Sequence, residues 1–323
     1  MEELEQFDRE NLMKIAQWYY FDGLTQEKIA EKMNCTRQRM NRIVRSLIDL
    51  GVVSIKLNGT IGRYATLENR LEKAFALKRV IIADVDHAAD SKLVLSRKTA
   101  QFLESFINNR QKVGISFGST LSQVVACMKT QVKSLCTVVQ LSGGVDVEHM
   151  LSTIRPDATA RQLARKLSCD PMLLCCSQKM RDKGPKEYLD DQLVQKTMTA
   201  YGSCDIAIVG IGEMSQEGSA FKLDYIDREQ LKKAQSRGCI GEIAFNTYTG
   251  EGAWNGYLPG EKAIGIDAGR LEGIPYVIAV AEGEKKTDCV LGALRTGAVD
   301  ILAIDSLLAK RLAKRLQLDS ARE

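Results

Sequence analysis

From residue 78 onward, short apolar runs alternate with longer stretches in which apolar residues recur at helical spacing. Most of the runs are continuously apolar, as is typical of strands buried on both faces of a sheet. This alternation predicts an α/β fold, with a doubly wound and mostly parallel sheet between two layers of helices. Strands are expected at residues 78–84, 112–118, 136–144, 172–177, 204–212, 276–283 and 300–305.

The first fifty residues instead have the pattern of three short helices. A helix over 10–21 is followed by a second helix that Thr25 can cap. The second helix ends before Asn34, a residue type that tolerates the left-handed backbone of a tight turn. Thr36 can cap a third helix that reaches about residue 50. The residues expected to face the interior are Leu12, Ile15, Ala16, Tyr19, Ile29, Ala30, Met33, Met40, Ile43, Val44, Leu47 and Ile48.

The exposed face of the third helix concentrates positive charge. Four arginines lie within residues 37–45, whereas residues 1–57 together hold nine basic and nine acidic side chains. Arginine, glutamine and asparagine can bind base edges in the major groove, and arginine also neutralises phosphates. A merely solvated helix face is the alternative. The side chains expected to contact DNA are Thr25, Gln26, Thr36, Arg37, Gln38, Asn41, Arg42 and Arg45.

The chain after the third helix suggests where the domains divide. The sequence VVSIKL (52–57) alternates like a short strand and could form a wing. An amphipathic helix follows a polar linker, and it could pack on a neighbouring subunit or bridge two domains. Three parts are therefore expected: a helix-turn-helix domain at 1–57, a linker and connecting helix at 58–77, and an effector and oligomerisation domain at 78–323.

Glycines gather where the predicted strands end, and ligands of doubly wound sheets bind beyond the carboxyl ends of the strands. Gly118, Ser119 and Thr120 follow one strand and open a helix, where free N–H groups and two hydroxyls can hold a phosphate. The ends at 141–144, 209–212 and 281–286 are glycine-bearing as well. Four such ends on one rim favour a small polar ligand over four unrelated turns.

The glycine-rich segment 238–260 also contains Trp254 and three further aromatic residues. Glycines give a loop mobility, so the segment suits a loop that covers a ligand. A surface excursion without a role in binding is the alternative.

Composition excludes several classes of protein. The chain has nine cysteines without a C-x-x-C pair and only two histidines, His87 and His149, which argues against a zinc site or a disulfide framework. No apolar run has the length of a membrane helix, and the acidic N-terminus is unlike a signal peptide. We expect a reduced, cytoplasmic protein without cofactor or metal. The vicinal Cys175 and Cys176 leave a thiol-based sensor as a minor alternative.

At this point the motifs line up with a known family. The chain resembles the SorC-type sugar-binding transcriptional regulators, which join a helix-turn-helix to an effector domain. The resemblance runs through nearly the whole chain, and the order and spacing of its motifs make it specific. The matching stretches are 15–33, 36–55, GISFGSTL (114–121), LSGG (141–144), DIAIVGIG (205–212), 237–252, 263–286 and 293–306.

The resemblance implies an effector domain similar to the glucosamine-6-phosphate deaminase and ribose-5-phosphate isomerase fold. This domain would bind a sugar, usually phosphorylated, without converting it. It also implies a homo-oligomer, a tetramer or dimer of dimers, on a palindromic operator. The effector-binding positions that the strand ends and the resemblance indicate are Gly118, Ser119, Thr120, Ser142, Gly143, Gly144, Gly212, Glu242, Phe245, Glu282 and Lys286.

The sequence departs from the family pattern at several of these positions. Glu242 stands where the family has aspartate, and Glu282 replaces a glycine. Phe245 matches the family's aromatic position only weakly. A carboxylate at Glu282 that faces the ligand would disfavour a multiply anionic one.

We therefore expect a ligand-responsive transcriptional regulator, a repressor or an activator. A sugar-phosphate isomerase or deaminase with a DNA-binding appendage is the alternative. Such chemistry needs a positioned acid and base, and neither histidine lies at a glycine-rich strand end. Carboxylates such as Asp146, Glu242 and Asp305 keep that alternative open.

Overall fold

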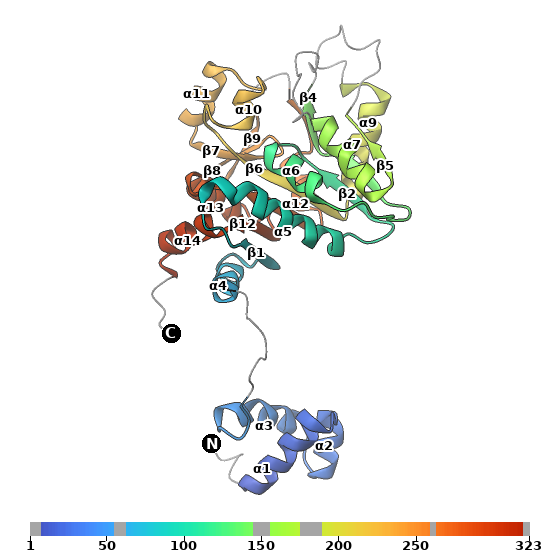
Figure 1. The fold of residues 1–323 in the computed structure, drawn as a ribbon, viewed down its shortest axis with the longest axis vertical. Helices are drawn as coiled ribbons and strands as arrows, with labels where there is room; N and C mark the ends of the chain where they lie inside the picture. The colour runs from blue at the N-terminus through green and yellow to red at the C-terminus, as the bar shows by residue number, and fades with distance from the viewer. Residues whose placement is uncertain (1–7, 55–62, 145–155, 175–188, 259–262, 319–323) are drawn as a thin grey trace. The chain divides into compact units, whose positions relative to one another are not determined.

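The computed structural model describes residues 8–54, 63–144, 156–174, 189–258 and 263–318 (Figure 1). The chain divides into two compact units, residues 1–61 and 62–323. The helix that the sequence places in the connecting segment belongs to the second unit.

The first unit is built from short helices whose ends the sequence marks. The helices are α1 (Arg9–Ala16), which continues as the π-helical turn η1 (Gln17–Phe21), α2 (Gln26–Lys32) and α3 (Arg37–Asp49). The hydroxyl of Thr25 accepts a hydrogen bond from the N–H of Lys28, and that of Thr36 accepts one from the N–H of Arg39. Asn34 has a φ of +48°, which makes the tight turn between α2 and α3.

The interior of this unit consists mainly of the residues that the periodicity selects. Ile15, Ile29, Met40 and Leu47 are fully buried. Ile48 was expected inside and is exposed, because it lies one turn beyond Arg45 on the outer face of α3. The expected wing is not seen in the part described, since residues 52–54 form no strand and 55–57 lie outside the described residues.

The second unit contains the predicted parallel sheet. Its strand order is β1-β12-β11-β6-β2-β3-β5, and all of these neighbours pair in parallel. Most of the predicted strands are present, and the bounds of several are shorter. These are β1 (Arg79–Ala83), β2 (Lys112–Ile115), β3 (Thr137–Gln140), β5 (Asp170–Met172), β6 (Ile206–Glu213), β11 (Tyr276–Ala281) and β12 (Ile301–Asp305). The strand expected at 172–177 instead lies at 170–172 and shares only Met172 with the prediction, and 175–177 lie outside the described residues.

Side chains alternate between the two faces of the sheet, and each face has its own helices (Figure 1). Ile81, Ile115 and Ile278 point to one core, and Ile82, Val139 and Ala279 point to the other. The first face is covered by α5 (Ser91–Phe106), α6 (Ser119–Cys127) and α7 (Pro156–Leu167). The second is covered by α4 (Ala65–Phe75), α9 (Gln192–Ala200), α12 (Ala268–Glu272), α13 (Thr287–Arg295) and α14 (Ser306–Arg315).

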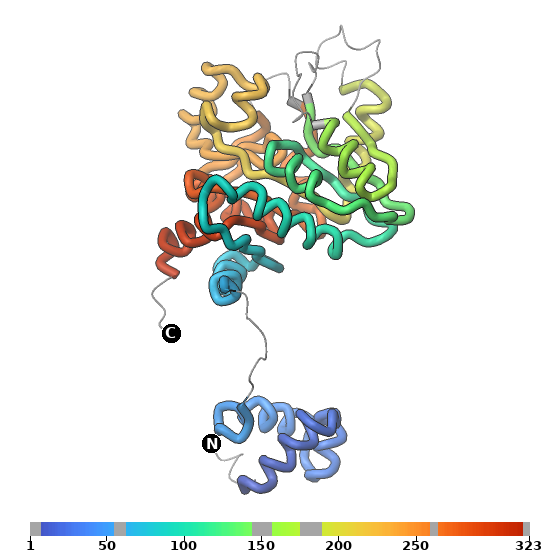
Figure 2. Tube along the Cα trace, viewed as in Figure 1, coloured from blue at the N-terminus to red at the C-terminus, as the bar shows by residue number. Residues whose placement is uncertain are grey.

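Helix α4 closes the edge of the sheet at β1. Its Leu71 is fully buried in the core of the second face. The carboxylates of Glu72 and Glu68 accept hydrogen bonds from the N–H groups of Val80 (2.8 Å) and Ile82 (2.9 Å). Figure 2 shows α4 beside the C-terminal helix α14, with which it is in contact although the two are far apart in sequence.

The glycine-rich segment 238–260 is not the expected loop. Most of it forms three antiparallel strands, β7 (Cys239–Ile243), β8 (Asn246–Thr249) and β9 (Trp254–Tyr257), which extend from the last residues of β6. Gly241 serves close packing, because a Cβ there would lie 2.3 Å from the hydroxyl oxygen of Tyr248. With the short helices α10 (Ser219–Lys222) and α11 (Arg228–Ser236), these strands enclose a small aromatic core around Phe117, Tyr225 and Phe245.

The predicted strand 136–144 is divided in two. After β3, the chain turns away as β4 (Ser142–Gly144), which pairs antiparallel with β10 (Ala263–Gly265). The buried side chain of Gln140 stabilises this turn, since its amide donates to the carbonyl of Ser142 and its oxygen accepts from the N–H of Leu174.

Candidate effector cavity and DNA-binding face

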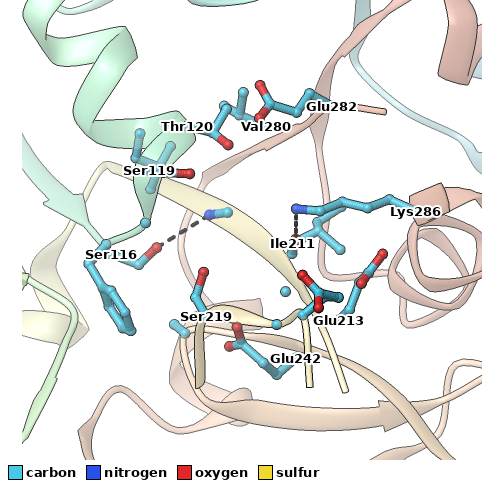
Figure 3. A pocket seen from close by; sticks show the side chains of 18 residues that line it. Ser116, Ser119, Thr120, Ile211, Glu213, Ser219, Glu242, Val280, Glu282 and Lys286 are labelled. Carbon is cyan, nitrogen blue, oxygen red and sulfur yellow. Dashed lines mark hydrogen bonds between the residues drawn. The ribbon is translucent and has the colours of Figure 1, made fainter. Parts of the chain in front are cut away.

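A polar cavity of about 180 Å³ lies at the carboxyl ends of β2, β6 and β11 (Figure 3). Parallel α/β sheets bind their ligands at this rim. The lining residues come from the β2–α6 loop, the end of β6 and the segment before α10, strand β7 and the turn after it, and the end of β11 with the loop after it. They are Ser116–Leu121, Gly210–Glu213, Glu217–Ser219, Glu242, Ala244, Val280, Glu282 and Lys286.

The β2–α6 loop brings a helix start to the cavity. Gly118 precedes α6 with a φ of +135°, a backbone conformation that side chains with a Cβ rarely adopt. Ser119 and Thr120 form the first turn of the helix, where backbone N–H groups lack intrahelical partners. This arrangement favours negative charge or a hydrogen-bond acceptor in front of the helix.

Lys92, at the start of α5, contacts this loop from outside the cavity lining. Its ammonium group donates a 3.0 Å hydrogen bond to Oγ of Ser119 and lies 3.3 Å from a carboxylate oxygen of Glu282. The second oxygen of Glu282 is buried and accepts no hydrogen bond from the described residues. Lys92 thus joins the start of α6 to a carboxylate at the end of β11.

Glu242 lines the opposite side of the cavity (Figure 3). One of its carboxylate oxygens accepts a 2.7 Å hydrogen bond from the N–H of Phe245. Burial raises the pKa of Glu242 to about 7, although that hydrogen bond and the charge of Lys286 oppose the rise. Its carboxyl group therefore exchanges a proton near neutral pH.

The loop after β11 carries Lys286 to the cavity. The ammonium group of Lys286 donates a 2.7 Å hydrogen bond to the carbonyl of Ile211, which leaves its remaining protons for a ligand (Figure 3). Buried Asp305 holds the beginning of the loop, since its carboxylate accepts a 2.6 Å hydrogen bond from the N–H of Gly283. The same carboxylate caps α14, so the loop and the helix share one anchor.

Seven of the positions selected from the sequence line this cavity: Gly118, Ser119, Thr120, Gly212, Glu242, Glu282 and Lys286. Ser142, Gly143 and Gly144 do not line it, because β4 turns toward β10. Phe245 lies in the aromatic core and touches the site through its N–H, which binds Glu242. Sequence reasoning missed three lining residues, Ser116, Glu213 and Ser219, although each stands within two residues of a glycine. It also missed Lys92, which contacts Ser119 from a helix without any glycine.

The exposed face of α3 carries the predicted DNA-binding side chains. Arg37, Gln38, Arg42 and Arg45 are exposed, and Asn41 is partly exposed. Arg45 stands one turn before Asp49, yet neither Arg37 nor Arg45 forms an ion pair with any residue that the structure describes. Thr25, Gln26 and Thr36 begin the two helices of the motif, and the two threonine hydroxyls serve as helix caps.

Several cysteines, histidines and aspartates do not appear among the residues that line the cavity. Burial raises the pKa of Cys204 and Cys289 to about 12, so both thiols stay protonated at neutral pH. Asp305 is engaged in capping, and His87 lies outside the lining. Asp146, His149, Cys175 and Cys176 fall outside the described residues.

Within the part of the chain that the structure describes, no helix is long and apolar enough to cross a membrane, and no side-chain cluster could hold a metal ion.

Comparisons with known proteins agree with this architecture. Residues 60–314 match the family model "Putative sugar-binding domain". The sorbitol operon regulator of Klebsiella pneumoniae is 24% identical over 310 residues, which cover 94% of this chain and 97% of that protein. The transcriptional regulator LsrR of Escherichia coli K12 is 27% identical over 306 residues, which cover 92% of each chain.

Solved structures share the fold. The full-length sorbitol operon regulator SorC of K. pneumoniae superposes with a TM-score of 0.68 at 23% identity, covering 95% of this chain and 99% of that one. A transcriptional regulator of Streptococcus pneumoniae superposes with a TM-score of 0.69 at 22% identity, covering 78% of this chain and 97% of that one.

The helix-turn-helix unit, the parallel sheet with its cavity and the matched domain together define a ligand-responsive transcriptional regulator with a sugar-binding domain. The chain belongs to the SorC-type family of such regulators.

Proposed function

We propose that α3 binds operator DNA in the major groove and that a sugar or sugar phosphate in the cavity changes this binding. The observation that carries the proposal is the cavity itself. It joins the start of α6 to glutamates and a lysine that can bind hydroxyl groups and acidic groups. The names of the relatives, which include a sorbitol operon regulator and a deoxyribonucleoside regulator of Bacillus subtilis, support this class of ligand.

The face of α3 supplies the contacts to DNA. Arg37 and Arg45 are exposed and free of ion pairs with described residues, so their guanidinium groups can reach bases or phosphates. The remaining contacts are assigned to Gln38, Asn41 and Arg42, with Thr25, Gln26 and Thr36 at the helix starts. Because DNA is the partner, the protein acts in the cytoplasm.

The ligand acts by shifting a conformational equilibrium. It must bind two arrangements of a homo-oligomer, a tetramer or dimer of dimers, with different affinities. Half-sites on DNA repeat with the helical turn, so a change in the spacing of paired recognition helices alters operator affinity.

The cavity binds its ligand without converting it. Isomerase and deaminase chemistry needs both a base and an acid in contact with the substrate. Glu242 has a pKa near neutrality that suits proton transfer, and this observation keeps the enzyme alternative testable. The relatives are named as regulators, which favours binding alone.

The test uses the full chain. Selection from random duplex DNA identifies the operator, and fluorescence anisotropy then measures its affinity with and without a panel of sugars and sugar phosphates. At least one member should change the affinity, and the recovered sugar should be chemically unchanged. A panel without effect on DNA binding, or a ligand that is converted at catalytic rates, would contradict the proposal.

A further inference from the structure

The cavity is richer in acidic groups than a phosphate site requires. Among the residues that the structure describes, four glutamates line it, Glu213, Glu217, Glu242 and Glu282, against one lysine, Lys286. Glu217 is paired with Lys222 at 2.6 Å and points to the surface, so three carboxyl groups remain in contact with the cavity. Figure 3 shows Glu282 on the side of Ser119 and Thr120, and Glu242 with Glu213 on the opposite side.

Glu282 places negative charge near the start of α6, the position that would otherwise suit a phosphate. Lys92 connects the two, because its ammonium group contacts both Oγ of Ser119 and the carboxylate of Glu282. The carboxylate of Glu282 thus neutralises the ammonium group of Lys92. A phosphate in front of α6 would place its negative charge close to this carboxylate, and like charges in a partly buried site repel strongly.

The free oxygen of Glu282 also calls for a hydrogen-bond donor. It is buried and accepts no hydrogen bond from the described residues. A buried acceptor without a partner costs free energy, which a ligand hydroxyl or amine would offset and a phosphate oxygen would not. Glu242 presents a second carboxyl group across the cavity, where it too can accept a hydrogen bond from a ligand hydroxyl.

We infer that the effector of this chain is an unphosphorylated sugar or sugar alcohol, and that Glu282 with Lys92 is the determinant that rejects the phosphate ester. This inference rests on the proposed function and names its ligand class. The start of α6 binds a hydroxyl oxygen through Ser119 and Thr120. The carboxylate of Glu282 accepts a hydrogen bond from a hydroxyl group at the same end of the ligand.

The experiment separates this specificity from the proposed function. Inorganic phosphate is the first probe, and its binding to the full chain is followed by phosphorus NMR and by the thermal unfolding midpoint. Wild-type protein and Glu282→Gln are compared, after both are shown to fold. Glu284→Gln is the matched control, because it removes the same charge from the same loop while its side chain faces Arg311, 3.9 Å away.

Wild type and Glu284→Gln should bind phosphate equally weakly, and Glu282→Gln should bind it at least about tenfold more tightly. Equal phosphate affinity in wild type and Glu282→Gln would overturn the inference. If Glu282→Gln does not fold, Glu282→Ala takes its place with the same expectation.

The second probe is a set of pentoses, hexoses and hexitols, each tested with and without its terminal phosphate for operator release. The unphosphorylated member of a pair should act at lower concentration. A phosphorylated member that acts at lower concentration would overturn the inference and still support the proposed function. A set without any effect would refute the proposed function, while the phosphate comparison would still decide the role of Glu282.

Discussion

Gly212 and Glu242 face each other across one pair of antiparallel strands, so closely that a Cβ on Gly212 would lie 2.0 Å from Oε1 of Glu242. Only glycine at this position leaves the carboxyl group its place in the cavity. Gly212→Ala should therefore displace Glu242 and abolish the response of operator binding to the effector, while operator affinity without effector stays unchanged. Gly269→Ala is the control, because its Cβ would meet Oδ1 of Asp267 at an ordinary 3.5 Å. A normal effector response in Gly212→Ala would contradict the placement of the site.

Glu242 should make stability depend on pH. Its pKa is raised from 4.5 to about 7 in the folded chain, so the folded state holds a proton that the unfolded state releases. The free energy of unfolding should fall as pH rises from about 4.5 to about 7, by at most about 3 kcal/mol from this group. Glu242→Gln should remove that part of the dependence. Denaturant titrations across this pH range measure it, and parallel curves for variant and wild type would refute the assignment.

Gly118 should be intolerant of any side chain for reasons of backbone strain alone. Its φ of +135° lies in a region that residues with a Cβ rarely adopt, although there is open space around it. Gly118→Ala should lower the free energy of unfolding by about 1–3 kcal/mol and weaken effector binding. Gly202→Ala, with equally open space and no positive φ, should be nearly neutral. Equal stability of the two variants would show that the loop relaxes without cost.

Asp305 should couple the stability of the fold to the shape of the cavity. Its carboxylate accepts two hydrogen bonds from the start of α14 and one from Gly283. In Asp305→Asn an amide donor replaces one of these acceptors, so the free energy of unfolding should fall by about 1–3 kcal/mol. Effector affinity should fall as well, since the loop that carries Lys286 loses its anchor. Asp267→Asn, an exposed cap, should cost less, because asparagine caps helices about as well as aspartate.

The guanidinium groups of α3 should contribute to operator binding individually. Arg37→Ala or Arg45→Ala should cost about 1–3 kcal/mol of binding free energy if the side chain contacts a base. If it contacts a phosphate instead, the slope of log affinity against log salt should decrease by about one. Arg228→Ala, an exposed arginine on α11, should leave both quantities unchanged. Intact affinity and salt slope in both α3 variants would contradict the assignment of the recognition helix.

The layers of the fold could be predicted because each strand and helix has a recognisable local sequence pattern. Continuous apolar runs such as 206–209 are typical of strands with both faces covered, and these residues are fully buried here. The hydroxyls of Thr25 and Thr36 cap the helices that follow them. The rim of the sheet followed from topology, which brings the carboxyl ends of parallel strands together. Gly118, Gly212 and Glu282 could therefore be placed on the cavity.

Features that depend on partners distant in sequence could not be predicted. The sequence of the strands at 239–257 predicted a loop, because a glycine can serve either mobility or close packing. Here Gly241 serves close packing with Tyr248, and the sequence alone does not distinguish the two roles. Ser142–Gly144 were expected at the cavity, but the hydrogen bonds of the Gln140 side chain hold them in the turn toward β10. No local sequence pattern indicates the two partners of Gln140. Lys92, on α5, forms an ion pair with Glu282, and the two residues are far apart along the chain.

The carboxylates of Glu68 and Glu72 occupy the outward N–H groups of β1, at the end of the parallel sheet. An open edge of this kind can recruit a strand from another molecule and start uncontrolled polymerisation. Here helix α4 covers this edge, and its two glutamates place negative charge in front of any approaching strand. In the proposed homo-oligomer, subunits would therefore meet through side chains of their helices and loops rather than by joining their sheets at this margin.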